Sequence, residues 1–268
     1  MNKKKSIVII TTFIIITLCV GLLGYKFIQN EINQNNRINE LQNDISLLKA
    51  ELKEQNNSTR ANYSDTLFNY VAIGNSITKH SINDYWWNEV GMAATSREKD
   101  YVHLITSHLE DLYGDVCMNA LNYSVWEMQA TDRAETYQLL DYYLDNRLNL
   151  VTIQLSENVN DMATYETDFE ELIRYIQECA PNAQIIVIDD FWNSDDKSNL
   201  KEKAAQNTGV DFVSLSEIKG KQEYQCGMGT TVYDSDGQEH IVDHEGVALH
   251  PNDKGMKYIA DAVISVIE

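Results

Sequence analysis

Apolar runs and segments of helical period alternate along residues 67–268. Short apolar runs bounded by polar residues predict five strands, at 69–74, 115–121, 149–155, 184–189 and 211–215. Apolar residues that recur every three or four positions predict five helices, at 97–113, 130–147, 163–180, 195–207 and 252–267. This alternation is typical of a mostly parallel sheet covered by helices on both faces. It predicts an α/β domain whose reactive groups lie at the carboxyl ends of the strands.

A longer apolar run lies near the N-terminus. Residues 6–25 contain no charged side chain, and a helix rising about 1.5 Å per residue would carry them across a bilayer core. Three lysines precede the run and only Lys26 directly follows it, which places the N-terminus in the cytoplasm and the main domain outside. We therefore predict a single-pass membrane anchor within residues 1–28. A cleaved signal peptide is the alternative, although no A-x-A site follows the run.

A heptad pattern occupies the next segment. Its apolar positions are spaced 3, 4, 3 and 4, at Ile38, Leu41, Ile45, Leu48 and Leu52. We expect a helical spacer over residues 29–57, and self-association through a coiled coil at 31–56 is the alternative use of the same pattern. Polar residues at 58–66 break the pattern and predict a linker to the domain at 67–268.

Composition and charge narrow the classes of function. The chain has 268 residues and is 43% hydrophobic, which is enough for the core of one sizeable domain. Its formal net charge is −20, and nucleic acid is not an expected partner because phosphate contacts require clustered Lys and Arg. The four cysteines form no CxxC pair, so neither a disulfide framework nor a zinc site is expected.

Candidate catalytic groups follow the first and third predicted strands and precede the last predicted helix. Ser76 follows the first strand, Asn158 follows the third, and His250 stands before Pro251. A serine hydroxyl needs a neighbouring base to become a nucleophile, and an oxyanion needs fixed N–H donors. His250 is the candidate base, whereas Asn158 and the backbone N–H of Ser76 are candidates for the oxyanion hole.

Three motifs surround these residues in a fixed order: "GNSIT" at Ser76, "SENV" at Asn158 and "HPNDKGMKYIADAV" at His250. This ordered set resembles the first, third and fifth blocks of the SGNH (GDSL-type) hydrolases. The resemblance covers about residues 68–268 and implies a flavodoxin-like three-layer α/β/α sandwich. It also implies ester hydrolysis without a cofactor, with Ser76 as nucleophile, His250 as base and Asn158 as oxyanion donor.

The chain departs from the family pattern in all three regions of the site. Asn75 stands where the family usually has an aspartate, and Ser156 replaces the glycine of the third block. Asn160 and Asp161 offer an alternative register for the oxyanion donor. The glycine of the second block is missing, and the candidates for its backbone donor are Ser124, Trp126 and Glu127.

The acid that usually orients the histidine is also missing. The family places an aspartate three residues before the histidine, and Val247 occupies that position here. Asp243 and Glu245 are candidates to replace it through a loop, and a backbone carbonyl that leaves a Ser–His dyad is the alternative. An imidazole without a carboxylate partner is a poorer base, so low turnover or a narrow substrate range is expected.

Other residues near His250 permit different interpretations. One of them is a metal site, whose candidate ligands are His240, Asp243, His244, Glu245 and His250. The glycine-rich surroundings argue against His240 and His244 sharing a helix face. We therefore expect no bound metal. Tyr85, Trp86 and Trp87 either stack on a substrate or pack in the interior. The sequence as a whole predicts an extracellular serine esterase acting on acyl esters, with O-acetyl groups on glycans as candidate substrates. The alternative is a surface glycan-binding or assembly module with weak chemistry.

Overall fold

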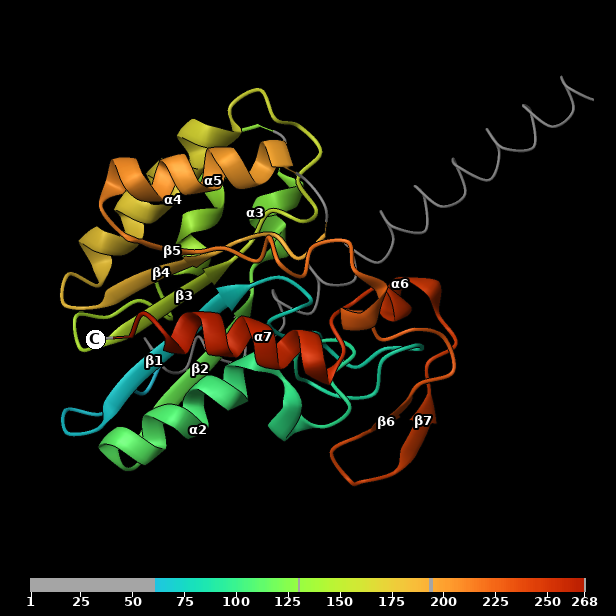
Figure 1. Ribbon diagram of the computed structural model, residues 1–268. Coiled ribbons are helices and arrows are strands. Elements are labelled where there is room, and N and C mark those ends of the chain that lie inside the picture. Colours follow the sequence, from blue (N-terminus) through green and yellow to red (C-terminus); the bar gives the residue numbers. More distant parts are fainter. Residues whose placement is uncertain (1–60, 130, 193–194, 268) are drawn as a thin grey trace, which may run out of the picture. The chain divides into compact units, whose positions relative to one another are not determined.

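The computed structural model describes residues 61–129, 131–192 and 195–267 of the chain (Figure 1). Its centre is a parallel sheet of five strands in the order β2-β1-β3-β4-β5. The strands are β1 Phe68–Gly74, β2 Val116–Asn122, β3 Leu150–Gln154, β4 Gln184–Ile188 and β5 Asp211–Val213. All five predicted strands are therefore confirmed, and the order is that of flavodoxin-like doubly wound sheets.

Helices cover both faces of the sheet. In Figure 1, α4 (Tyr165–Cys179) and α5 (Asp195–Thr208) lie on one face, and α2 (Tyr101–Tyr113) and α7 (Asp253–Ile264) lie on the other. Four of the five predicted helices are thus confirmed. The first of them is divided at Asp100, which ends the short helix η1 (Arg97–Lys99) and caps α2 by accepting from the N–H of His103.

The main core lies between the sheet and the α2/α7 layer. Ile105 and Leu109 of α2, Met256 and Ile259 of α7, and Tyr70 of β1 belong to one cluster of fully buried residues. Burying each large apolar side chain contributes about 1.5–3 kcal/mol. The helical residues of this cluster recur at intervals of three or four positions, which explains why the sequence pattern located both helices.

The predicted helix at 130–147 is wrong. This region instead contains η2 (Arg133–Leu139), a 3₁₀ helix, followed by turns. Arg133 is buried and donates to the carbonyls of Trp126 (3.2 Å) and Asp161 (3.1 Å), and it forms an ion pair with Asp168. Asp132 before it has a φ of +54°. The buried guanidinium ties this segment to other loops and overrides its helical periodicity.

The segment at 219–249, which lies between the last predicted strand and the last predicted helix, contains several short elements. They are η3 (Gln222–Tyr224), the antiparallel hairpin of β6 (Thr231–Tyr233) and β7 (Glu239–Ile241), and α6 (Glu245–Ala248). A second small hydrophobic cluster joins the hairpin region to the segment after β1, through Trp86, Val90, Val232, Val242 and Val247 among others. A further unpredicted helix, α3 (Ser124–Met128), follows β2.

The N-terminal predictions fall mostly outside the described residues. The anchor at 1–28 and the spacer at 29–57 lie wholly outside them. The predicted linker is described from Ala61 on, where the Ala61 N–H donates to the Tyr142 carbonyl and the Tyr63 hydroxyl donates to the Tyr143 carbonyl. Within residues 61–267, as far as they are described, no helix has both the length and the apolar character of a membrane span.

Candidate active site

The turn after β1 brings Ser76 to the carboxyl edge of the sheet. Gly74 closes the strand, and a Cβ there would lie 1.8 Å from Thr78 Oγ1 and 2.7 Å from the Gln154 carbonyl oxygen. Only glycine fits between these atoms. The turn continues with a hydrogen bond from the Thr78 N–H to the Asn75 carbonyl (3.0 Å), and the Ser76 side chain is left partly exposed.

His250 follows α6 and meets Ser76 at this edge. Ser76 Oγ and His250 Nε2 are 2.7 Å apart, although 174 positions separate the two residues in the chain. His250 Nδ1 lies 2.8 Å from the Gly246 carbonyl oxygen. Because a carbonyl oxygen only accepts, Nδ1 carries the proton and Nε2 presents its lone pair to the serine hydroxyl. The two side chains have the geometry of a nucleophile and its general base.

The environment of His250 keeps its ring neutral. The residue is 6% exposed, and burial is the largest cause that lowers its pKa from 6.5 to about 4. His80 and His244 nearby also lower this pKa, whereas the bond to the Gly246 carbonyl acts in the opposite direction. A neutral imidazole can accept a proton at physiological pH, but a pKa this low makes it a weak base.

The structure does not bring the candidate acid partners to the histidine. Asp243 and Glu245 are both exposed, and the Nδ1 atom of His250 is occupied by the Gly246 carbonyl. Val247, at the position where the family has its aspartate, is fully buried in the second hydrophobic cluster. The chain thus carries a Ser–His dyad oriented by the backbone, which is the alternative that the sequence left open.

Asn158 lies on the loop after β3 and is tied to the turn that carries Ser76. Its Nδ2 donates to Glu127 Oε2 (2.7 Å), and Asn75 Nδ2 donates to Glu127 Oε1 (3.1 Å). Glu127 is buried, and burial raises its pKa. Asn158 is therefore held beside the nucleophile turn through this carboxylate. Its role as an oxyanion donor stays a prediction.

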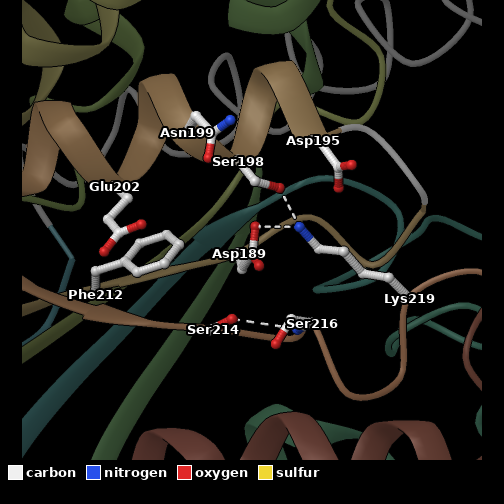
Figure 2. A pocket seen from close by; sticks show the side chains of 9 residues that line it. All are labelled: Asp189, Asp195, Ser198, Asn199, Glu202, Phe212, Ser214, Ser216 and Lys219. Atoms are coloured by element: carbon white, nitrogen blue, oxygen red, sulfur yellow. Dashed lines mark hydrogen bonds and ion pairs between the residues drawn. The ribbon is translucent and has the colours of Figure 1, made fainter.

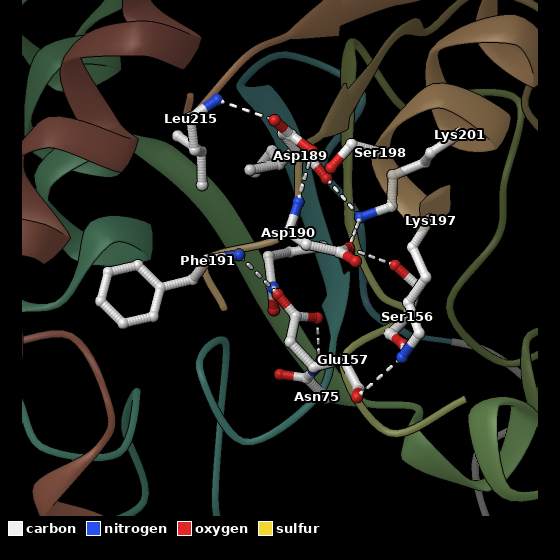
Figure 3. Close-up of polar contacts among 12 residues, drawn as sticks. Asn75, Ser156, Glu157, Asp189, Asp190, Phe191, Lys197, Ser198, Lys201 and Leu215 are labelled. Atoms are coloured by element: carbon white, nitrogen blue, oxygen red, sulfur yellow. Dashed lines mark hydrogen bonds and ion pairs between the residues drawn. The ribbon is translucent and has the colours of Figure 1, made fainter. Parts of the chain in front are cut away.

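A network of buried and half-buried polar groups extends from Asn75 to α5 (Figure 3). Glu157 accepts from Asn75 Nδ2 (2.8 Å), and burial together with the charge of Asp190 raises its pKa to about 7. Asp190 accepts from the Ser156 hydroxyl and forms a fully buried ion pair with Lys201 (2.7 Å). These side chains lie behind the carboxyl edge of the sheet and support the loops that carry the site.

The second-block candidates for an oxyanion donor are largely engaged elsewhere. The N–H of Ser124 donates to Asn122 Oδ1 (3.1 Å), and the N–H of Trp126 donates to the Tyr123 carbonyl (3.0 Å). Glu127 enters the site through its carboxylate instead. The alternative register at Asn160 and Asp161 lies farther along the loop, where the Asp161 carbonyl accepts from Arg133.

The other histidines near the site are paired with neighbouring side chains. His244 stacks on Tyr85 with 4.3 Å between ring centroids, and His240 stacks on Trp87 at 4.5 Å and bonds to Asp234 (2.9 Å). Trp86, by contrast, is buried in the second hydrophobic cluster. Among the described residues, no group of three or more His, Cys, Asp or Glu side chains is arranged to hold a metal ion.

A cavity of about 480 Å³ opens elsewhere, between α5 and the ends of β4 and β5 (Figure 2). The Lys219 amine lies in its wall and donates to Asp189 (2.7 Å) and to the Ser198 hydroxyl. The complete lining is Asp189, Asp195, Ser198, Asn199, Glu202, Phe212, Ser214, Ser216 and Lys219. Neither Ser76 nor His250 lines this cavity, so it is separate from the dyad.

Sequence reasoning missed the carboxylates that support the site. The sequence pattern indicates a role for Glu127 only through its backbone N–H, and it indicates none for Glu157 or Asp190. The sequence signal for them is a glutamate inside the "SENV" motif and another directly after Trp126. Trp192, whose ring lies edge-on to His250 at 5.1 Å, was also missed.

Solved structures similar to the chain include esterases and lipases. One is a two-domain esterase active on acetylated mannans, at 16% identity, covering 74% of this chain and 48% of that one, with a TM-score of 0.48. A second is an extracellular lipase from Streptomyces rimosus, at 13% identity, covering 74% and 99%, with a TM-score of 0.47.

A third similar structure is described as a GDSL-like lipase from Parabacteroides merdae, at 14% identity, covering 77% of this chain and 97% of that one, with a TM-score of 0.47. The chain thus spans about half the length of the two-domain esterase. No protein-family model matches the chain, and no curated protein matches it. Identities this low transfer no residue roles, so the chemistry of the chain rests on its own side chains.

Proposed function

We propose that this protein is a serine esterase that hydrolyses acyl esters with the dyad of Ser76 and His250. The observation that carries the proposal is the 2.7 Å contact between Ser76 Oγ and His250 Nε2. The bond from Nδ1 to the Gly246 carbonyl strengthens it, because this bond fixes the tautomer in which Nε2 can accept the serine proton.

The proposed reaction has two steps. Ser76 Oγ attacks the ester carbonyl while His250 Nε2 takes its proton and then passes it to the departing alkoxide, which leaves as an alcohol. Water then attacks the acyl-enzyme with His250 again as base, and the acid is released. The oxyanion is held by the backbone N–H of Ser76 and by Asn158. Within the described part of the chain, that N–H donates to no backbone carbonyl.

We assign the substrate to the acyl esters, with O-acetyl esters on glycans as the first candidates. The rings of Trp192 and Tyr85 lie on the side of the site formed by His250 and His244. Aromatic surface beside a few polar groups is typical of small-molecule sites. An acetyl group needs little room at the nucleophile, and the rings supply contact area for the remainder of the substrate.

The proposed location is the outer face of the cell membrane. The uncharged run at 6–25 would anchor the chain with its N-terminus in the cytoplasm, and the hydrolase domain would face outward. Residues 31–56 would hold the domain away from the membrane, as a single helix or as a coiled coil that joins copies of the chain.

A second candidate function is a surface glycan-binding or assembly module with little chemistry. The observation that favours it is the carbonyl of Gly246 in the place of a carboxylate, beside the buried Val247. A serine-reactive fluorophosphonate probe separates the two functions. Labelling that requires Ser76 and His250 supports the esterase, whereas glycan binding without labelling supports the module.

Replacing Ser76 with alanine is expected to lower the kcat for p-nitrophenyl acetate by at least about 100-fold, because it removes the attacking oxygen. The measurement uses the full-length chain purified in detergent. The matched control is Ser107→Ala, which removes an exposed hydroxyl from α2 and is expected to keep the wild-type rate. Equal rates in the wild type and in Ser76→Ala would contradict the proposed function.

A further inference from the structure

Glu127 is a buried carboxylate whose hydrogen bonds reach both loops of the Ser76 site. It is 2% exposed. Its Oε1 accepts from the Ser156 N–H (2.5 Å) and from Asn75 Nδ2 (3.1 Å), and its Oε2 accepts from Asn158 Nδ2 (2.7 Å). A carboxylate removed from water is tolerated only where donors surround it. These donors come from the turn that carries Ser76 and from the loop that carries Asn158.

Glu157 accepts a hydrogen bond from the same asparagine (Figure 3). Its Oε2 accepts from Asn75 Nδ2 (2.8 Å), and its Oε1 accepts from Gln154 Nε2 (2.7 Å) and from the Phe191 N–H (3.0 Å). Because an amide nitrogen has two N–H groups, Asn75 gives one to Glu157 and one to Glu127. We call Glu127 and Glu157 the carboxylate clamp.

The clamp explains why position 75 carries an amide. An aspartate there would place an oxygen about as close to the two carboxylates as the present Nδ2, which lies 3.1 Å from Glu127 Oε1 and 2.8 Å from Glu157 Oε2. Carboxylates that share a buried site cannot all ionise without strong repulsion. Asn75 is therefore matched to one buried and one half-buried acid, and its replacement by the aspartate usual in the resembling family would be harmful in this chain.

Ser156 shows that the clamp also holds a strained backbone. Its φ is +117°, in a region that favours glycine. Its N–H donates to Glu127, and its hydroxyl donates to Asp190. A side-chain-bearing residue keeps such a conformation only when its surroundings enforce it. Glu127 thus helps to set the start of the loop that presents Asn158.

We propose that Glu127 and Glu157 are positioning residues of the esterase site, which hold the Asn75 amide between them and so fix the turn that carries Ser76. Glu127 also fixes Asn158 relative to that turn. The inference rests on the proposed function. Neither carboxylate is assigned a contact with substrate, and both act through the residues that they hold.

The test is a double-mutant cycle of Asn75→Asp, Glu157→Gln and their combination in the full-length chain in detergent, assayed with p-nitrophenyl acetate. Asn75→Asp alone brings three carboxylates together and is expected to lower kcat by about tenfold or more. Glu157→Gln alone replaces one accepting oxygen with an N–H₂ group, which then faces an N–H donor of Asn75, Gln154 or Phe191. This variant is expected to lower kcat as well. In the combination, the amide at 157 donates to the carboxylate at 75, so kcat should exceed that of Asn75→Asp by about threefold or more.

The expected signature is a change of sign: Glu157→Gln is harmful in the wild type and helpful beside Asn75→Asp. KM should stay within about threefold throughout, because the clamp does not touch substrate. If the combined variant loses kcat by the product of the two single losses, residues 75 and 157 are not coupled and the proposed clamp is overturned. A sign change in melting temperature alone, with kcat per folded molecule unaffected, would overturn the positioning role.

Glu127→Gln gives a second variant for the case in which Asn75→Asp does not fold. It is expected to lower kcat by about tenfold with KM nearly unchanged, and wild-type kcat in this variant would overturn the proposal. Asn62→Asp and Glu135→Gln make the same charge changes at exposed positions and should keep the wild-type rate. If the proposed function itself is wrong, Ser76→Ala has the same kcat as the wild type, and this outcome is distinct from failure of the clamp.

Discussion

At the scale of single residues, His250 combines two properties that act against each other. Its burial keeps the ring neutral and ready to accept a proton, but the same burial lowers its pKa to about 4 and weakens it as a base. The unfolded chain takes up this proton near pH 6.5, whereas the folded chain does so only near pH 4. Between these values the unfolded state binds more protons, so His250 lowers the free energy of unfolding as pH falls.

The pH dependence of kcat/KM follows from the same group. For p-nitrophenyl acetate, kcat/KM is expected to show no loss from His250 protonation near pH 6.5 and to fall only as the pH approaches about 4. Glu157, with its pKa raised to about 7, also titrates near the site. If kcat/KM falls near pH 7 in the wild type but not in Glu157→Gln, the fall is caused by titration of the Glu157 carboxyl. A fall near pH 6.5 that persists in Glu157→Gln would contradict the prediction for His250.

The sequence located the groups of the site that lie in motifs but not the groups that hold them. Ser76 and Asn158 follow the neighbouring strands β1 and β3, so strand order predicts that they lie at one edge, whereas the position of His250 depends on the segment between α6 and α7. Glu127 and Glu157 act through contacts between loops far apart in the chain, and no spacing rule connects them to Asn75. The orienting carbonyl of Gly246 could not be identified either, because every residue has a carbonyl.

At the scale of elements, α5 is joined to the sheet by a buried charge. Lys201 is fully buried, and its amine donates to the Ile188 carbonyl (2.7 Å) and to Asp190 (2.7 Å). Burial alone would lower the pKa of Lys201, but the nearby carboxylates, Asp190 first and then Glu157, together outweigh it and raise that pKa. The weakly amphipathic helix α5 thus depends on an ion pair for part of its attachment.

Lys201→Met is expected to lower the free energy of unfolding by about 3–5 kcal/mol, because it leaves the Asp190 carboxylate buried without its partner. Urea unfolding of the full-length chain in detergent, followed by tryptophan fluorescence, measures the change. Asp190→Asn combined with Lys201→Met removes both charges and should be more stable than Lys201→Met alone. A combination that is less stable than the single variant would contradict this account.

Elements were predictable where one face is buried against the sheet. The residues Phe169, Leu172, Ile173 and Ile176 of α4 repeat at helical spacing and are all buried. The segment at 130–147 has a similar spacing, but the buried guanidinium of Arg133 decides its conformation instead. The hairpin of β6 and β7 escaped prediction because each strand has only three residues, too few for a pattern of period two to stand out.

At the scale of the whole molecule, the predicted anchor gives a direct test of location. The full-length chain is expected to sediment with membranes, to remain there in high salt and to be released by detergent, because burial of an apolar helix does not depend on ionic strength. A chain lacking residues 1–28 should stay in the supernatant. Recovery of the full-length chain in the supernatant without detergent would contradict the anchor.

The distance along the chain between the two halves of the dyad has a consequence for biosynthesis. The strand before Ser76 is the first of the described elements to leave the ribosome, and the segment with His250 is nearly the last. Until α7 docks beside α2, a nascent polypeptide holds a hydroxyl with no imidazole to activate it. The proposed esterase is therefore expected to be inactive during its own translation, and the onset of turnover would report that α7 has packed against the sheet.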